Sequence, residues 1–142
     1  MNVGILNKAD NQVVEQIGNL LHKLSPAAVA PDFQRLSQLI SDADFKLFVA
    51  SDENGSIVGM LTLTRCHTLA GSKYWIEDVI VDEVCRGKGA GRALVQAAVQ
   101  HVKQQDGHHS IYLTSNPSRV SARNLYRSEG FEEYNTGVFR IR

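Results

Sequence analysis

Residues 86–92 combine glycines and cations in a way that suits an anion. In order, they are Arg86, Gly87, Lys88, Gly89, Ala90, Gly91 and Arg92. The glycines remove the Cβ atoms that would keep a phosphate from the backbone, and the cations favour an electron-rich group such as a pyrophosphate. A helix expected from Ala90 adds N–H groups without intrahelical partners and the positive end of its macrodipole. We therefore expect a phosphate-binding loop between a strand over 75–81 and this helix.

Two better-known phosphate loops do not fit this segment. A dinucleotide fingerprint needs glycines spaced G-x-G-x-x-G, and counting from Gly87 places Arg92 at the last position. A P-loop needs Gly-x-x-x-x-Gly-Lys followed by Ser or Thr, and no glycine is placed for it. What remains is the pattern Arg-x-x-Gly-x-Gly. The alternative is an ordinary strand-to-helix turn whose glycines allow close packing.

Residues 116–131, NPSRVSARNLYRSEGF, carry a second pattern. An Asn follows an expected strand and precedes Ala-x-x-Leu-Tyr-x-x-x-Gly-Phe. Together with the Arg-x-x-Gly-x-Gly loop, this resembles the two motifs of the GNAT superfamily of acetyl-CoA-dependent N-acetyltransferases. The resemblance is most specific over 76–131, and Ile-Glu-Asp at 76–78 looks like the branch that acetylates polyamines and amino sugars. The matching positions of the second motif are Asn116, Ala122, Leu125, Tyr126, Gly130 and Phe131.

The resemblance implies that Tyr126 is a general acid. An amine that attacks a thioester expels a thiolate, which leaves more easily once it is protonated. A phenol with a pKa of about 10 can donate that proton and be refilled from water. The alternative is that Tyr126 is a core aromatic, because it shares a helical face with Ala122, Leu125 and Glu129.

A carboxylate near the thioester could act as the base, because an ammonium must lose a proton before it attacks. Glu77 and Asp78 are the candidates on the central strand. Strand alternation predicts that they lie on opposite faces, with Glu77 on the face of Val79 and Val81. In the branch that this segment resembles, the Glu is the usual base, so Glu77 is preferred to Asp78. The alternative is that both acids hold a loop or a cap.

The resemblance also implies how the cofactor is held. In this fold the fourth and fifth strands splay apart, and the pantetheine arm of CoA enters the gap like an extra strand, so the central strand offers backbone groups to it. Asn116 and Asn124 are candidates for further pantetheine contacts. The alternatives are that Asn116 forms a turn and that Asn124 lies on a solvated helix face. Outside the loop, the expected cofactor contacts are Val79, Ile80, Val81, Asn116, Ala122, Asn124 and Arg127.

Arg119, Arg123 and Arg127 recur at every fourth position and so form a basic stripe on one helix face. Contact with the 3′-phosphate of CoA is one interpretation. Pairing with Glu residues on a solvated surface is the other.

Composition bounds the class of protein. A length of 142 residues suits one domain, 1–142, and a hydrophobic content of 43% is ordinary for a globular chain. The formal net charge of zero favours neither nucleic acid nor a membrane surface as a partner. No apolar run reaches the length of a membrane span, and the N-terminus lacks the apolar core of a signal peptide. Cys66 and Cys85 lack metal-ligand spacing, so we expect reduced thiols in a cytoplasmic protein and no metal.

The periodicity predicts an α+β fold (an α/β mixed sheet) in the order β-αα-βββ-α-β-α-ββ, with helices on both faces. This is the order of the GNAT fold. Asp10 or Asn11, Asp32 and Ser118 are expected helix caps, and 68–73 is an expected loose connection. Expected helices cover 11–24, 33–40, 90–105 and 119–129. Expected strands cover 3–6, 45–51, 57–66, 75–81, 110–115, 131–134 and 138–141.

The function that follows from this resemblance is transfer of the acetyl group of acetyl-CoA to a primary amine in a ternary complex. The acceptor stays open among small amines, amino sugars, aminoglycosides, peptide N-termini and protein lysines, and its site is expected near 22–33 and 134–138. The alternative is a non-catalytic acyl-CoA-binding or regulatory module on the same fold. The presence of Tyr126 and an acidic base candidate favours an enzyme. The resemblance also implies that a homodimer through the C-terminal strands is possible.

Overall fold

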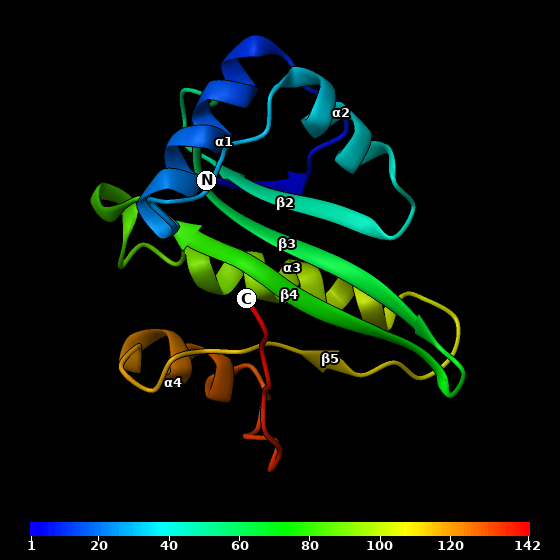
Figure 1. Ribbon diagram of the computed structural model, residues 1–142. Helices are drawn as coiled ribbons and strands as arrows, with labels where there is room; N and C mark the ends of the chain where they lie inside the picture. Colours follow the sequence, from blue (N-terminus) through cyan, green and yellow to red (C-terminus); the bar gives the residue numbers. More distant parts are fainter.

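A five-stranded mixed sheet forms the centre of the protein in the computed structural model, which describes residues 1–142 (Figure 1). The strands lie side by side in chain order, and every neighbouring pair is antiparallel except the last, which is parallel. The expected mixed-sheet class is confirmed. The strands are β1 (Asn2–Ile5), β2 (Phe45–Ser51), β3 (Ile57–Thr68), β4 (Gly71–Val81) and β5 (Ile111–Tyr112).

Helices cover both faces of the sheet (Figure 1). On one face lie α1 (Asn11–Leu24) and α2 (Phe33–Ser41), and on the other lies α3 (Ala90–Lys103), preceded by the short turn η1 (Glu83–Cys85). The helix α4 (Val120–Ser128) continues the layer of α3 beyond β5, where its Leu125 lies against Gly91. None of these helices is both long and apolar enough to cross a bilayer.

Aspartates begin the first two helices, as the sequence predicts. Asp10 accepts a hydrogen bond from the N–H of Val13 at 2.8 Å, and Asp32 accepts one from Arg35 at 2.8 Å. Each bond satisfies one N–H that the first turn leaves without a partner. Ser118 does not cap α4, because its N–H and its hydroxyl both donate to Asn116 instead.

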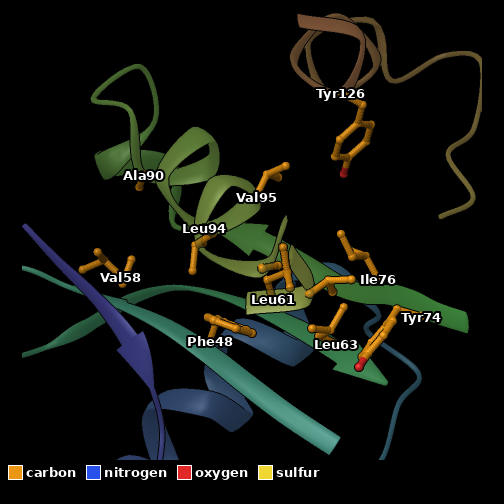
Figure 2. Close-up of a cluster of buried hydrophobic side chains, with 13 residues drawn as sticks. Phe48, Val58, Leu61, Leu63, Tyr74, Ile76, Ala90, Leu94, Val95 and Tyr126 are labelled. Carbon is orange, nitrogen blue, oxygen red and sulfur yellow. The ribbon is translucent and has the colours of Figure 1, made fainter. Parts of the chain in front are cut away.

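Two apolar clusters flank the sheet. The larger lies between the sheet and α3, and it includes Phe48, Leu61, Leu94 and Val95 (Figure 2). The smaller lies under α1 and α2, and Met60 belongs to it. The three central strands, β2, β3 and β4, therefore contribute residues to both clusters, as a sheet covered on both faces requires.

The sheet is weakest between β4 and β5. Only two residue pairs join them, Tyr74 with Ile111 and Trp75 with Tyr112. Beyond these pairs the strands part, and the edge of β4 from Ile76 to its end has no neighbour on that side. The expected splay between the fourth and fifth strands is therefore present, and the regular part of β5 is much shorter than the expected strand 110–115.

A one-residue bulge interrupts β4 at the start of this unpaired edge. The register with β3 shifts between Met60 and Thr62, so Asp78 and Val79 together face the single residue Leu61. Asp78 has a φ of 53° and is the only residue other than glycine with positive φ. Sequence alternation alone does not reveal this bulge.

The expected last two strands, 131–134 and 138–141, do not form. A strand needs a neighbouring backbone to pair with, and residues after Phe131 find only one internal backbone bond, from Thr136 to Tyr134 at 2.8 Å. Phe139 is consequently 97% exposed. The prediction of a loose connection over 68–73 is also wrong. This segment is more regular than expected, because β3 and β4 continue into it and meet at a tight turn.

Candidate active site

A cleft of about 200 Å³ opens where β4 and β5 part. It brings together the three expected catalytic residues, which come from β4 and from a helix more than forty residues later in the chain. The cleft is lined by Leu24, Ile76, Glu77, Asp78, Val79, Leu113, Thr114, Arg119 and Tyr126. Of these, Leu24 lies in the expected acceptor segment 22–33, whereas Leu113 and Thr114 carry no signal in the sequence that marks them as cleft residues.

Tyr126 is a core aromatic that also lines the cleft. Its ring belongs to the larger core cluster and is 6% exposed. Figure 2 shows the side chain leaving α4 with its hydroxyl end directed toward Ile76 on β4, across the cleft that both residues line. The hydroxyl makes no hydrogen bond within the protein, and burial raises its pKa above the ordinary value. The phenol is therefore protonated and free to donate toward the cleft.

Glu77 and Asp78 lie on the same face of the sheet, so the prediction of opposite faces is wrong. Glu77 pairs with Thr62, which shares the face of Met60 toward α1 and α2. The bulge turns Asp78 to that face as well, where its Oδ2 accepts a hydrogen bond from Thr62 Oγ1 at 2.9 Å. Val79 packs toward α3 instead.

The two carboxylates differ in their surroundings. Partial burial raises the pKa of Glu77, and the neighbouring charge of Asp78 raises it further. A carboxylate with a raised pKa is a better proton acceptor, which suits the expected role of Glu77. Asp78 is held by its bond to Thr62, so part of its hydrogen-bonding capacity is already used.

The unpaired edge of β4 presents alternate residues to the gap. The backbone bond from Asp82 to Val58, at 2.7 Å, sets the phase of the ladder between β3 and β4. Counting back from it, Ile80 directs its N–H and C=O to β3, whereas Val79 and Val81 direct theirs to the gap. Of the three expected backbone contacts, two are available to a ligand and that of Ile80 is used within the sheet.

The glycine loop leaves a row of backbone donors free. None of the six N–H groups from Gly87 to Arg92 donates a hydrogen bond within the protein, and α3 has no side-chain cap. Gly87 and Gly89 adopt φ of 78° and 85°, and no atom lies within 4 Å of where a Cβ would stand on either. This open, Cβ-free concavity of donors fits an anionic diphosphate.

The cations of the loop have different partners. Arg86 Nε donates to Val81 O at 3.2 Å and so fastens the loop to the end of β4. Lys88 has no ion-pair partner in the protein. Arg92 is paired with Glu129 at the end of α4 and also donates to Ser128. Arg92 therefore ties α3 to α4, and its charge is not free in the way that the sequence suggests.

The three arginines of the basic stripe, 119, 123 and 127, also differ in whether they form ion pairs. Arg123 and Arg127 both pair with Glu133, which matches the solvated-surface interpretation for these two residues. Arg119 forms no ion pair and lines the cleft. The guanidinium of Arg127 also donates a long hydrogen bond to Asn124 Oδ1, at 3.4 Å.

Two further positions bear on cofactor contacts. Asn116 uses its side-chain oxygen for the turn to Ser118, and Ala122 packs against the core. Ser115, which sequence reasoning missed, has a buried hydroxyl without a hydrogen-bond partner in the protein. It lies just beyond β5 and directly after Leu113 and Thr114, which line the cleft. An unpartnered buried hydroxyl at this position fits a polar ligand such as the pantetheine arm.

No group of three His, Cys, Asp or Glu side chains lies close enough together to hold a metal ion, and both cysteines are free thiols. The free donors of the loop, the unpaired edge of β4 and the orphan hydroxyl of Ser115 are instead consistent with a CoA thioester.

Comparison with known proteins agrees with this geometry. The chain is 30% identical over 111 residues to an aminoglycoside N(6')-acetyltransferase type 1 of Stenotrophomonas maltophilia, a match covering 75% of this chain and 72% of that protein. It is 30% identical over 60 residues to a spermine/spermidine N(1)-acetyltransferase of Bacillus subtilis (strain 168), covering 42% and 40%. For the spermine/spermidine acetyltransferase and two further curated relatives, the match spans only 40% to 59% of the relative's length.

The fold is shared over the full chain with a solved structure, a putative acetyltransferase from Agrobacterium tumefaciens str. C58. The TM-score is 0.81, the identity is 25%, and the match covers 100% of this chain and 99% of the other. Residues 14–131 match the model of the acetyltransferase (GNAT) family, which is most of the chain. The family expected from the two motifs is confirmed, with a polyamine acetyltransferase among the relatives, and the chain belongs to the GNAT acetyltransferase family.

Proposed function

We propose that this protein transfers the acetyl group of acetyl-CoA to a primary amine by direct attack in a ternary complex. The observation that carries the proposal is the cleft itself. A carboxylate with a raised pKa and a buried, unbonded phenol border one opening in the sheet, next to a loop of free backbone donors. Proton acceptor, proton donor and anion site are the three parts that amine acylation requires.

The chain's own groups would hold acetyl-CoA along the gap. The N–H groups from 87 to 92 would take the diphosphate, and the backbone of Val79 and Val81 would pair with the pantetheine arm. Arg86, Lys88 and Arg119 have no ion-pair partner near this path, and of these only Arg86 is already bonded to a backbone carbonyl, that of Val81. When bound, acetyl-CoA supplies an activated acyl thioester at the cleft.

Two side chains then move the protons. Glu77 takes a proton from the acceptor ammonium, directly or through water, and so frees its lone pair for attack. The N–H of Val79, directed at the gap, polarises the acyl carbonyl. Tyr126 gives its hydroxyl proton to the departing sulfur. Asp78, bonded to Thr62, adds charge beside Glu77.

The acceptor enters from the α1 side in this proposal. Both carboxylates lie on that face, and Leu24 at the end of α1 closes the same side of the cleft. Two carboxylates favour a cationic amine. The relatives named for aminoglycosides and for spermine and spermidine act on amines of this kind, which supports small cationic amines as the first acceptors to test.

The test is release of CoA thiol from acetyl-CoA with a panel of amines: spermidine, glucosamine, kanamycin, a peptide with a free N-terminus and a lysine-containing peptide. We expect turnover with at least one small cationic amine. By calorimetry, we expect acetyl-CoA to bind with micromolar affinity and neither ATP nor NAD to bind. Binding of acetyl-CoA without turnover on any amine would favour the non-catalytic acyl-CoA-binding module. Absence of binding would overturn both.

A further inference from the structure

Apart from the two buried tyrosines, Thr62 is the only buried residue with a polar or charged side chain, with 3% of its surface exposed. It lies in β3 directly opposite Glu77, and its hydroxyl donates to Asp78 Oδ2 at 2.9 Å. A buried hydroxyl is unfavourable unless it is bonded, and Asp78 supplies the bond. The bond therefore joins a buried hydroxyl to the one non-glycine residue with positive φ.

The conformation of Asp78 needs such a contact. A side chain other than glycine is strained at a φ of 53°, and strained residues persist only where surrounding contacts hold them. No other side-chain hydrogen bond involves Asp78. Thr62 is thus the one side chain that fastens Asp78 in this conformation.

The bulge at Asp78 decides which parts of β4 face the gap. Before it, Tyr74 directs its N–H toward β5 and bonds to Ser110 at 3.0 Å. After it, Val79 and Val81 face the gap, so the outward positions change from even to odd numbers. A β4 strand without the bulge would direct the backbone groups of Asp78 and Ile80 to the gap in place of those of Val79 and Val81.

We propose that Thr62 is a positioning residue of the acetyl-transfer site. Its hydroxyl holds Asp78 in the left-handed conformation and so fixes the bulge that places Asp78 beside Glu77 on the acceptor side and directs the backbone of Val79 to the gap. Thr62 does not line the cleft, so it acts through Asp78 and touches neither substrate. The kinetic consequence rests on the proposed function, whereas the effect on the backbone does not.

The kinetic test compares Thr62→Val, which keeps the shape of the side chain, with Thr62→Ser, which keeps the hydroxyl. With acetyl-CoA and the best amine of the panel, Thr62→Val should lower kcat by about tenfold or more with smaller changes in KM, because misplaced groups act mainly on the chemical step. Thr62→Ser should recover most of the loss. The control is Thr64→Val, two residues along β3, whose hydroxyl makes no hydrogen bond. Equal losses in Thr62→Val and Thr64→Val would overturn the proposal.

A second variant separates positioning from general loss of stability. Glycine adopts positive φ without strain, so Asp78→Gly keeps the bulge without help from Thr62. Adding Thr62→Val to Asp78→Gly should then cost less than about twofold in kcat. The same fold-loss in both backgrounds would contradict the proposal.

A crystal structure of Thr62→Val with CoA gives a readout that does not depend on turnover. We expect Asp78 to leave the left-handed region and the register of β4 with β3 to shift. An unchanged φ at Asp78 would overturn the positioning role even if activity falls. A wild-type protein without turnover would overturn the proposed function alone, and this structure would still decide the role of Thr62.

Discussion

The proton transfers that we propose for the cleft depend on two side chains whose pKa values both lie above their ordinary values. Burial is the main cause for Tyr126 and for Glu77, and the charge of Asp78 adds to the shift of Glu77. For a phenol this shift keeps the proton on the acid. For a carboxylate it makes the base stronger. The same partly dry cleft therefore prepares both groups in the direction that acyl transfer to an amine requires.

Tyr126→Phe tests the acid. We expect kcat to fall by about a hundredfold, because the sulfur must leave without its proton donor, while the affinity for acetyl-CoA changes little. Steady-state rates and calorimetry measure the two effects. Tyr74→Phe is the matched control, since it removes another buried phenol of the same core cluster that borders a different cavity. Equal losses in the two variants would exclude the acid role.

Glu77→Gln tests the base. A base must be ionised, so kcat/KM should be full above the pKa of Glu77 and fall as the pH drops through it. Because this pKa is raised, the acidic limb should lie above the ordinary range of a Glu, and Glu77→Gln should abolish it. Asp78→Asn should move the limb to lower pH, because it removes a charge that raises the pKa of Glu77. A limb unchanged in Glu77→Gln would assign the base elsewhere, and Glu53→Gln in the remote hairpin serves as control.

At the scale of single residues, the sequence predicts which candidate residues meet at the cleft but not how they are oriented. Glu77, Asp78 and Tyr126 do line one cleft, as their motifs predict. The shared face of the two carboxylates was not predictable, because it depends on a bulge that follows from the pairing of β4 with Thr62 in another strand.

At the scale of elements, the helix that carries the glycine loop and the helix that carries Tyr126 are fastened to each other. Arg92 in α3 pairs with Glu129 at the end of α4, and Gln96 also donates to Glu129 at 3.2 Å. Leu125 lies against Gly91 beside this polar contact. The position of the phenol is therefore linked to the helix that would hold the diphosphate.

Glu129→Ala tests this link. Removing the carboxylate should loosen α4, lower kcat by about tenfold through misplacement of Tyr126, and leave the affinity for CoA nearly unchanged. If Arg92 instead binds phosphate, Glu129→Ala should leave kcat intact and act on CoA affinity. Kinetics and calorimetry on Glu129→Ala and on Glu132→Ala, an exposed acid without an ion pair, distinguish the two.

Most elements follow from local signals, and the exceptions share a cause. Helices α1 and α2 begin at Asp10 and Asp32, as predicted, because a cap is a local hydrogen bond. The segments 131–134 and 138–141 have strand composition but no neighbour, and β5 has only two paired residues. Strand formation depends on a distant partner, which composition does not encode.

At the scale of the whole molecule, exposed ion pairs make stability sensitive to acid. Asp44, Asp82 and Glu133 each have a lowered pKa, caused mainly by a hydrogen bond from a cation. The folded state then holds fewer protons than the unfolded state, so their contribution is present above the ordinary carboxyl pKa and is lost as the pH falls through the lowered values. The hydrogen-bond donors are Arg65 for Asp44, Lys23 for Asp82 and Arg123 for Glu133. The raised pKa of Glu77 has the opposite effect on stability.

We therefore expect the urea midpoint of unfolding to decrease as the pH is lowered from about 5 to 3. Asp44→Asn should flatten part of this decrease, because it removes one of the groups with a lowered pKa. Asp106→Asn, which removes an acid without an ion pair, should leave the slope as it is. A midpoint that stays constant over this range would contradict the expectation.

The two residue pairs that join β5 to β4 have a consequence for how the protein responds to warmth. Local opening follows the line of fewest hydrogen bonds, and here that line passes through the proposed active site. Amide hydrogens of 111–128 should exchange with deuterium sooner than those of β2 and β3. Catalysis should disappear on heating before the circular dichroism of the helices does, since the phenol can separate from Glu77 while the rest stays folded. Coincident loss of both signals would show that the seam holds as firmly as the remainder of the sheet.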